Sequence, residues 1–278
     1  MGNSSKQIYD AETADGYTRF GSHCDKNVYD WARNALDPKL VEGSIVVDVG
    51  CGNGQQTFDH LLRQKAAKIV GVEASADMIA AIHPVQKEDP RIDIRQGDLT
   101  ELLPRMKGLR ADVVINLFNI LCFSHPDIPF EHMHSPLHVG GKLIAVSNAF
   151  APSNIKLDAS QPSKGLPIDL HTIGASQPPV RGGMVFRQVL DLEQPVPLQD
   201  HVHTIGDFAL ALPEQRWAIE SAIMFPPEGC TLIDPEDTHS EHSALHHEPR
   251  FESPHPVYSP RGEIRMQYIK LCLIAEKR

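Results

Sequence analysis

Short apolar runs alternate with amphipathic segments through the first half of the chain. Continuous apolar stretches bounded by turn residues are typical of buried strands. They predict strands at Ser44–Val49, Lys68–Glu73, Arg91–Gln96, Ala111–Leu117 and Gly141–Ser147. Segments between them, such as Thr57–Lys65 and Ser75–Ile82, have the spacing of amphipathic helices. This alternation predicts an α/β fold in which helices cover both faces of a parallel sheet.

The pattern changes in the second half. Two stretches, 151–182 and 226–262, are rich in Pro, Ser, Gly or His and have no clear period, so we expect irregular structure there. The remaining segments predict a hairpin-like pair, a helix and two strands, at Met184–Leu190, Val196–Val202, Ile205–Leu212, Trp217–Phe225 and Ile264–Ala275. Because a late strand closes the sheet, we expect a single domain over residues 1–278, with substrate-side insertions at about 151–203 and 226–262.

The first 40 residues are polar at first and then amphipathic. Asp25 is a candidate cap for a helix that would end at Asp37-Pro38. We expect this segment, about residues 1–40, to form a helical lid. The alternative is an ordinary amphipathic helix that packs on the core.

Composition narrows the class of protein. Hydrophobic residues make up 41% of the 278 residues and charged residues 22%, which is ordinary for a globular chain. The formal net charge of −10 argues against electrostatic attraction between the protein and the phosphates of a nucleic acid. We expect no membrane span and no secretory signal, because no apolar run is long enough. The five cysteines are scattered, which favours reduced thiols and a cytoplasmic location.

A glycine-rich loop follows the first predicted strand, in VVDVGCGNGQQT at 46–57. A dinucleotide fingerprint needs a small residue where Gln55 stands, and a P-loop needs Lys followed by Ser or Thr. An acid two residues before the glycines, Asp48, instead suits S-adenosylmethionine (SAM), whose methionine end is cationic and which has no phosphate. Glycines in such a loop let the backbone approach a ligand without a Cβ clash.

Two further acids follow predicted strands. Glu73 ends the second strand, where a carboxylate can accept hydrogen bonds from both ribose hydroxyls. Asp98 follows the third strand and can accept from the adenine amino group. Asn116 ends the fourth strand. The alternative to a cofactor contact, for Asp98 and Asn116, is an ordinary structural role as a cap at the end of a strand.

These motifs, VVDVGCGNG, GVEAS, QGD, ADVVINLF and GGKLIAVS, resemble class I SAM-dependent methyltransferases in order and spacing. The subgroup most similar is the ubiquinone/menaquinone-biosynthesis type of small-molecule methyltransferase. The resemblance covers about residues 9–150. It implies a Rossmann-like, doubly wound sheet, mostly parallel with an antiparallel C-terminal strand. It also implies SAM as cofactor and S-adenosylhomocysteine (SAH) as product. The run Ser135–Val139 departs from the subgroup, which has a basic residue there.

The resemblance also implies site residues. Asp48 and the loop glycines would line the methionine moiety, Glu73 would bind the ribose, and Asp98 would meet the adenine. Arg19 would pair with the methionine carboxylate, and Tyr17 would cover the site. Cys51 is expected to fill the loop without a catalytic role. The cofactor-binding set is therefore Tyr17, Arg19, Asp48, Gly50, Cys51, Gly52, Gly54, Glu73, Ala74, Gly97, Asp98, Leu99 and Asn116.

The methyl acceptor is less defined. Methyl transfer is an in-line displacement that sometimes needs a proton acceptor, and His suits that task near neutral pH. Candidate catalytic residues are His125, His203 and Tyr9, with ordinary structural roles as the alternative. We expect transfer to S, N or O of a small molecule. The alternatives are C- or O-methylation of a quinone-like precursor, a regulatory SAM-binding protein, and an NAD-dependent oxidoreductase, which Gln55 opposes.

A histidine-rich segment near the end of the chain has spacing compatible with a metal, at His239, His242, His246 and His247. A Pro-rich irregular loop preorganises ligands poorly, so we expect no metal there. A small-molecule acceptor and no nucleic acid are the expected partners, and a homodimer would follow if the N-terminal helix exchanged between protomers.

Overall fold

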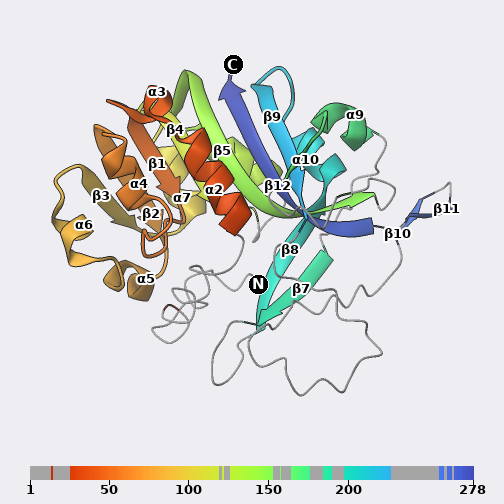
Figure 1. Ribbon diagram of the computed structural model, residues 1–278, viewed down its shortest axis with the longest axis horizontal. Helices are drawn as coiled ribbons and strands as arrows, with labels where there is room; N and C mark the ends of the chain where they lie inside the picture. Colours follow the sequence, from red (N-terminus) through yellow and green to blue (C-terminus); the bar gives the residue numbers. More distant parts are fainter. Residues whose placement is uncertain are drawn as a thin grey trace.

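A ten-stranded mixed sheet runs through the part of the chain that the computed structural model describes (Figure 1). The described residues are 14, 26–118, 121, 126–152, 157, 164–175, 184–189, 197–226, 257–259, 262–264 and 266–278. The main path of the sheet is β3 (Ile92–Gln96), β2 (Lys68–Glu73), β1 (Ile45–Val49), β4 (Ala111–Leu117), β5 (Leu137–Pro152), β12 (Met266–Lys277), β9 (Trp217–Phe225) and β6 (Leu166–Pro167).

The first five strands on this path are parallel to their neighbours. β12 lies between β5 and β9 and is antiparallel to both. β7 (Met184–Val189) and β8 (Pro197–Thr204) form an antiparallel pair, and the end of β8 joins β5. A separate pair consists of β10 (Val257–Ser259) and β11 (Gly262–Ile264). The predicted α/β fold, with a parallel core and antiparallel late strands, is confirmed.

Helices cover both faces of the sheet. They are α2 (Lys26–Ala35), α3 (Pro38–Val41), α4 (Phe58–Arg63), α5 (Ala76–Ala80), α6 (Pro84–Glu88), α7 (Leu99–Arg105), α8 (Asp127–His134), α9 (Leu170–Ala175) and α10 (Ile205–Ala211). Alternate residues of β1 serve the two faces, because successive strand side chains point in opposite directions. Val46 joins Leu36 and Leu61 on one face, whereas Val47 joins Leu103 on the other. The apolar runs are thus buried on both sides.

The predicted elements differ from the observed ones at particular places. Asp37-Pro38 was expected to end a helix, but Asp37 also caps α3, since its side chain accepts from the Leu40 amide and Pro38 fits the first helical turn. β5 is longer than the predicted strand Gly141–Ser147. The stretch expected to be irregular at 151–182 contains β6 and α9. The lid prediction for residues 1–25 lies outside the described residues apart from Ala14, and the division into one domain with two insertions stays a prediction.

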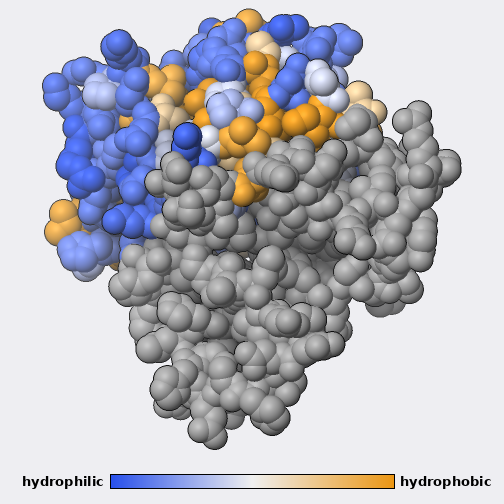
Figure 2. All heavy atoms as spheres, turned by 45° about the vertical axis from the view of Figure 1, so that its right-hand side comes forward, coloured by the Kyte–Doolittle hydropathy of each residue, from blue (hydrophilic) through white to orange (hydrophobic). Residues whose placement is uncertain are grey.

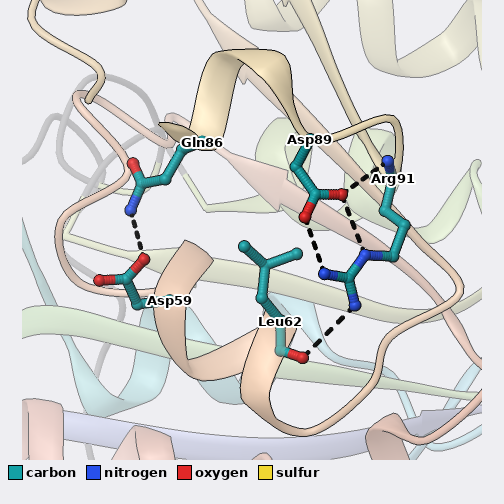
Figure 3. A network of polar contacts seen from close by, with 5 residues as sticks. All are labelled: Asp59, Leu62, Gln86, Asp89 and Arg91. Carbon is teal, nitrogen blue, oxygen red and sulfur yellow. Dashed lines mark hydrogen bonds and ion pairs between the residues drawn. The ribbon is translucent and has the colours of Figure 1, made fainter. Parts of the chain in front are cut away.

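A polar network fixes the corner between α6 and β3 (Figure 3). Asp89 accepts from Nε and Nη2 of Arg91 at 2.9 and 2.7 Å, and Arg91 Nη1 donates to the Leu62 carbonyl at 3.5 Å. Gln86 Nε2 donates to Asp59 Oδ1 at 2.8 Å. These contacts join the connection that leads into β3 to helix α4.

The surface of the described part is mixed in polarity. Figure 2 shows hydrophilic residues on one side of the molecule and apolar residues gathered beside them at the centre of the view. The large apolar side chains that are exposed are Val85, Ile128, Val139, Leu166 and Leu210. None of the helices in the described ranges is long and apolar enough to cross a membrane.

Candidate cofactor site

The carboxyl ends of β2, β1 and β4 border one cavity. β2 and β3 lie on one side of β1 in the sheet, whereas β4 lies on its other side. The order of the strands therefore reverses between β1 and β4. Ligands of open α/β sheets bind at such a reversal. The cavity is lined by Tyr29, Asp48, Gly50, Cys51, Gly52, Asn53, Gln56, Thr57, Glu73, Met78, Leu117 and Phe118.

The glycine loop owes its shape to left-handed backbone. Gly50, Gly52 and Gly54 have φ angles of +69°, +55° and +72°, which favour glycine. Gly50 and Gly52 line the cavity, whereas Gly54 does not. A Cβ on Gly54 would lie 2.3 Å from Cδ2 of Phe58. Gly54 therefore makes room for an aromatic ring beneath the loop rather than for a ligand.

Glu73 joins the end of β2 to this loop. Its Oε2 accepts from the Gly52 amide at 3.0 Å, and its Oε1 accepts from the Ala74 and Ser75 amides at 2.8 and 2.9 Å. The side chain is 6% exposed, and burial raises its pKa, while the three hydrogen bonds act in the opposite direction. The carboxylate is held in one orientation at the wall of the cavity.

Asp48 lies on the floor of the cavity and is almost fully buried. It accepts a short hydrogen bond from the Thr57 hydroxyl. Burial raises the pKa of Asp48 to about 7; the Thr57 hydrogen bond lowers it, and the negative charge of Glu73 adds to the increase. The carboxyl group can therefore gain or lose its charge near neutral pH, and a cationic ligand would favour the ionised form.

Thr57 was not among the predicted site residues. It occupies the N-cap position of α4, but its side chain makes no capping hydrogen bond. The hydroxyl goes to Asp48 instead. The sequence did contain a signal for Thr57 as a site residue. It is a Thr at the start of a helix, shortly after a buried acid and a glycine loop.

Cys51 is a half-buried thiol whose Sγ donates to the Gly52 carbonyl at 3.7 Å. Burial raises its pKa well above the ordinary value, and the charges of Asp48 and Glu73 add to this effect. A thiol that stays protonated is a poor nucleophile. The environment agrees with the expectation that Cys51 fills the loop.

Two aromatic residues, Tyr29 and Phe118, also line the cavity. Tyr29 of α2 packs edge-on against Phe118, with ring centroids 5.8 Å apart. Phe118 follows β4 and has a φ of +55°, which is uncommon for a residue other than glycine. Arg33 Nη1 donates to Gln56 Oε1 at 3.3 Å, so α2 also contacts the glycine loop. Sequence reasoning missed these residues because α2 and β4 meet only in the folded chain.

Six of the eleven predicted cofactor residues that the structure describes do not line the cavity. Ala74 contributes its amide to Glu73, Leu99 is buried in the core, and Gly97 packs near Leu102. Asp98 caps α7 and accepts from the Thr100 amide and hydroxyl at 2.9 and 2.7 Å. Asn116 is fully buried and donates to the Val49 carbonyl at 3.2 Å. The sixth is Gly54, described above.

The catalytic candidates are less well placed. His203 is 1% exposed, and its ring packs edge-on against Phe208 at 6.0 Å. It does not line the cavity. His125, Tyr9, Tyr17, Arg19 and the histidine-rich segment at 239–247 lie outside the described residues. No cluster of potential metal ligands occurs among the side chains that the structure describes.

Part of this chain is similar to known proteins. Residues 46–141 match the family model described as "Methyltransferase domain". Among curated proteins, the tRNA U34 carboxymethyltransferase of Hahella chejuensis is 29% identical over 45% of this chain and 39% of its own length. A ribosomal RNA small subunit methyltransferase A of Parasynechococcus marenigrum is 35% identical over 35% of this chain and 32% of its own length. The chain thus spans less than two fifths of these relatives.

Solved structures are similar over more of the chain. A putative S-adenosylmethionine dependent methyltransferase from Listeria monocytogenes superposes with a TM-score of 0.54 at 16% identity, over 91% of this chain and 98% of its own. The geranyl diphosphate C-methyltransferase from Streptomyces coelicolor A3(2), solved with Mg²⁺, geranyl diphosphate and SAH, gives 0.51 at 13% identity, over 90% and 77%. At such identities, the likeness concerns the fold.

Proposed function

This chain has the fold of the class I SAM-dependent methyltransferases and matches the methyltransferase-domain family over residues 46–141, and on that premise we propose that it transfers a methyl group from SAM to a small-molecule acceptor. The observation that carries the proposal is the cavity at the reversal of strand order, with Glu73 held at its wall by three backbone amides. SAM, when bound, supplies an electrophilic methyl group on a positively charged sulfur.

The cavity residues suit the parts of SAM. Three backbone amides occupy three of the roughly four acceptor positions of the Glu73 carboxylate, so its Oε2 keeps one position to which a ribose hydroxyl can donate. Asp48 places a carboxyl group under the cationic methionine end, and its raised pKa makes the charge responsive to the ligand. Tyr29 and Phe118 form an aromatic wall that excludes water from the reacting side. These roles follow from position and chemistry.

A small molecule suits this chain better than RNA. The two curated relatives are named for RNA substrates, but they match this chain over 45% and 35% of its length. The net charge of −10 opposes binding to a phosphate backbone. We therefore keep S, N or O of a small molecule as the acceptor atom. The ubiquinone/menaquinone subgroup, and with it C- or O-methylation of a quinone-like acceptor, stays the alternative.

His125, which follows the fourth strand in the sequence, and Tyr9, which belongs to the segment expected to form a lid, stay candidates for taking a proton from the acceptor. His203 is a weaker candidate, because its ring is buried against Phe208 and stands outside the cavity lining. We also keep a cytoplasmic location, which rests on the scattered cysteines.

Calorimetry with SAM and with SAH tests the proposal. Both should bind the purified protein. Asp48→Ala should weaken both, whereas Asp169→Ala, beside α9 and outside the cavity lining, should leave both affinities unchanged. Transfer of a labelled methyl group from SAM into a small-molecule extract then tests catalysis. Binding without transfer would favour a regulatory SAM-binding protein, and no binding of either ligand would exclude the proposed cofactor.

A further inference from the structure

Two buried carboxyl groups share the cofactor cavity. Asp48 is 3% exposed and Glu73 is 6% exposed, and both line the cavity. The described residues of the lining include no Lys, Arg or His. Neither acid takes part in an ion pair with a described residue. The described lining is therefore acidic, with no basic side chain to compensate it.

Asp48 is the less satisfied of the two acids. Its side chain accepts from the Thr57 hydroxyl, and this is the one hydrogen bond that the described part of the chain gives to its carboxyl group. A carboxylate has roughly four acceptor positions. Burial raises the pKa of Asp48 to about 7, and the negative charge of Glu73 contributes to that increase. A positive charge in the cavity would offset this repulsion and use the remaining positions.

Glu73 keeps its negative charge within the same cavity. The three backbone amides that donate to it favour its ionised form, but they neutralise none of its charge, because an amide is uncharged. Cys51 adds no charge of its own, since burial and the two acids raise its pKa well above the ordinary value. Compensation for the two carboxyl groups is therefore left to a ligand.

The inference rests on the proposed function, in which this cavity holds SAM. SAM and SAH share the adenosine and the amino-acid end, and they differ by the methyl group and the positive charge on sulfur. In the transfer, a lone pair of the acceptor forms the new bond to the methyl carbon. The carbon–sulfur bond breaks, and its electron pair stays on sulfur, which becomes a neutral thioether. The acceptor keeps the positive charge or releases a proton to water.

We propose that Asp48 and Glu73 select the positive charge on sulfur, so that the cavity holds SAM in preference to SAH. Coulomb interactions are much stronger in a buried site than in water. The sulfonium offsets the repulsion between the two acids, and this compensation is lost when the methyl group leaves. The two acids are in this role specificity-determining residues, which weaken the binding of the product and limit inhibition by it.

Three ligands separate the effect of charge from that of the methyl group. They are SAM, SAH and sinefungin, which carries an ammonium group where SAM has its methylated sulfur. Each is titrated into the purified protein in a calorimeter slightly above pH 7, where most of Asp48 is ionised. SAM and sinefungin should bind about tenfold more tightly than SAH. If sinefungin binds no better than SAH, charge does not set the preference and the inference is overturned.

Neutral variants of the two acids test the residues. Asp48→Asn should lower the ratio of SAM affinity to SAH affinity about three- to tenfold, and Glu73→Gln should lower it in the same direction. Contacts with the ribose and the amino-acid end cancel in this ratio, because both ligands have them. Asp77→Asn is the matched control: Asp77 is an exposed acid of α5 beside the lining residue Met78, and it does not line the cavity. Its ratio should equal that of the wild type, since solvent screens an exposed charge.

The outcomes distinguish the inference from the proposed function. If both ligands bind and neither neutral variant changes the ratio, the inference is overturned and the proposed function stands. If neither SAM nor SAH binds the wild type, the proposed function fails, and the inference fails with it.

Proton release provides a second measurement, which needs no variant if Asp48→Asn should not fold. Slightly below pH 7, Asp48 of the free protein carries a proton in a large fraction of the molecules. A cation in the cavity favours the ionised carboxylate, so SAM should release a larger fraction of a proton than SAH does. Calorimetry in two buffers of different ionisation enthalpy measures this fraction for each ligand. Equal release by SAM and SAH would contradict the inference.

Discussion

The two halves of the sheet differ in how the chain builds them and in what they hold. From β3 to β4, each strand is parallel to its neighbour and the connecting segments are short. This half carries the glycine loop, Asp48 and Glu73. The other half joins β5, β12 and β9, which come from distant parts of the chain, and β12 is antiparallel to both of its neighbours.

The difference separates two tasks. Local strand–loop–helix units place several backbone amides and carboxylates at one edge, which suits a cofactor of constant shape. The antiparallel half contributes single side chains from separate strands, such as Asn148 and Lys270, which are hydrogen-bonded to each other. We infer that cofactor affinity belongs to the first half, whereas stability is shared by both. Four predictions test this division.

The largest effect is expected from removing a core aromatic residue in the second half. Trp217 of β9 is 2% exposed and packs edge-on against His134 at 5.0 Å. Trp217→Ala should lower the free energy of unfolding by about 3–5 kcal/mol, through lost burial and the cavity left behind. Under conditions where the variant is folded, its SAH affinity should equal that of the wild type. Urea unfolding and calorimetry measure the two quantities.

Phe58→Ala is the counterpart in the first half. Its ring lies under the loop, so close that a Cβ on Gly54 or Gly71 would contact it. This variant should lose a similar amount of stability and also SAH affinity. Equal losses of affinity in both variants would refute the division of tasks.

The second prediction concerns pH. The folded pKa of Asp48, about 7, is above its ordinary value of 3.8, so the folded state binds a proton that the unfolded chain has already released. The resulting stability is fully present below pH 3.8 and is lost as pH rises to about 7. Relative to Asp48→Asn, which stays neutral, the wild type should lose up to about 4 kcal/mol of unfolding free energy across that window.

Urea titrations of both proteins at several pH values measure this difference, and SAM binding provides an independent check. Because a cationic ligand prefers the ionised carboxylate, SAM affinity of the wild type should rise with pH toward about 7 and then level off. A parallel pH dependence in Asp48→Asn would assign the effect to another group.

A smaller effect is expected at the glycine loop. Gly54→Ala should lower the unfolding free energy by about 3 kcal/mol, because the added Cβ meets Phe58 and the φ of +72° is unfavourable for alanine. Gly43→Ala is the matched control, since Gly43 has a similar φ of +76° with nothing within 4 Å. It should cost about 1 kcal/mol. Equal losses would mean that backbone strain, and not packing under the loop, sets the requirement.

The smallest effect should be on binding alone. Glu73→Gln keeps the shape of the side chain but replaces one acceptor oxygen by an amide that meets the Gly52 or the Ala74 and Ser75 donors. SAH affinity should fall about tenfold, equivalent to about 1.4 kcal/mol. The control is Glu101→Gln, at an exposed position of α7, with no change expected. A Glu73→Gln protein with wild-type affinity would remove Glu73 from the ribose site.

Much of the fold could be predicted because its signal is local. The bounds of β2, β4 and β9 equal the predicted ones, since each strand contains a short run of apolar residues that stands out in the local sequence. β6 and α9 were missed because Pro, Ser and Gly dominate the surrounding composition and their contacts are with distant elements. α9 packs on α10, and β6 pairs with β9. Such elements are specified by tertiary contacts and not by periodicity.

The candidate site divides in the same way. Asp48, the loop glycines and Glu73 could be predicted because they follow two neighbouring strands in a recognisable sequence pattern, and Asp48, Gly50, Cys51, Gly52 and Glu73 line the cavity. Tyr29, Met78 and Phe118 come from separate elements that only the fold brings to the same cavity. Asp98 and Asn116 lie outside that lining, where Asp98 caps a helix and Asn116 donates to a backbone carbonyl, and their contacts with the cofactor stay predictions.

The position of β12 between β5 and β9 has a consequence for how the protein forms during synthesis. The ribosome releases β5 long before β12, and β12 pairs with β5 from Met266↔Pro152 to Glu276↔Lys142. Until then, a long strand presents unpaired amides and carbonyls at the edge of a nascent sheet, which invites association with other chains. Closing so large a loop is also slow. We expect the strands of the first half to pair during translation. Chaperones should be needed chiefly in the interval between the synthesis of β5 and its pairing with β12.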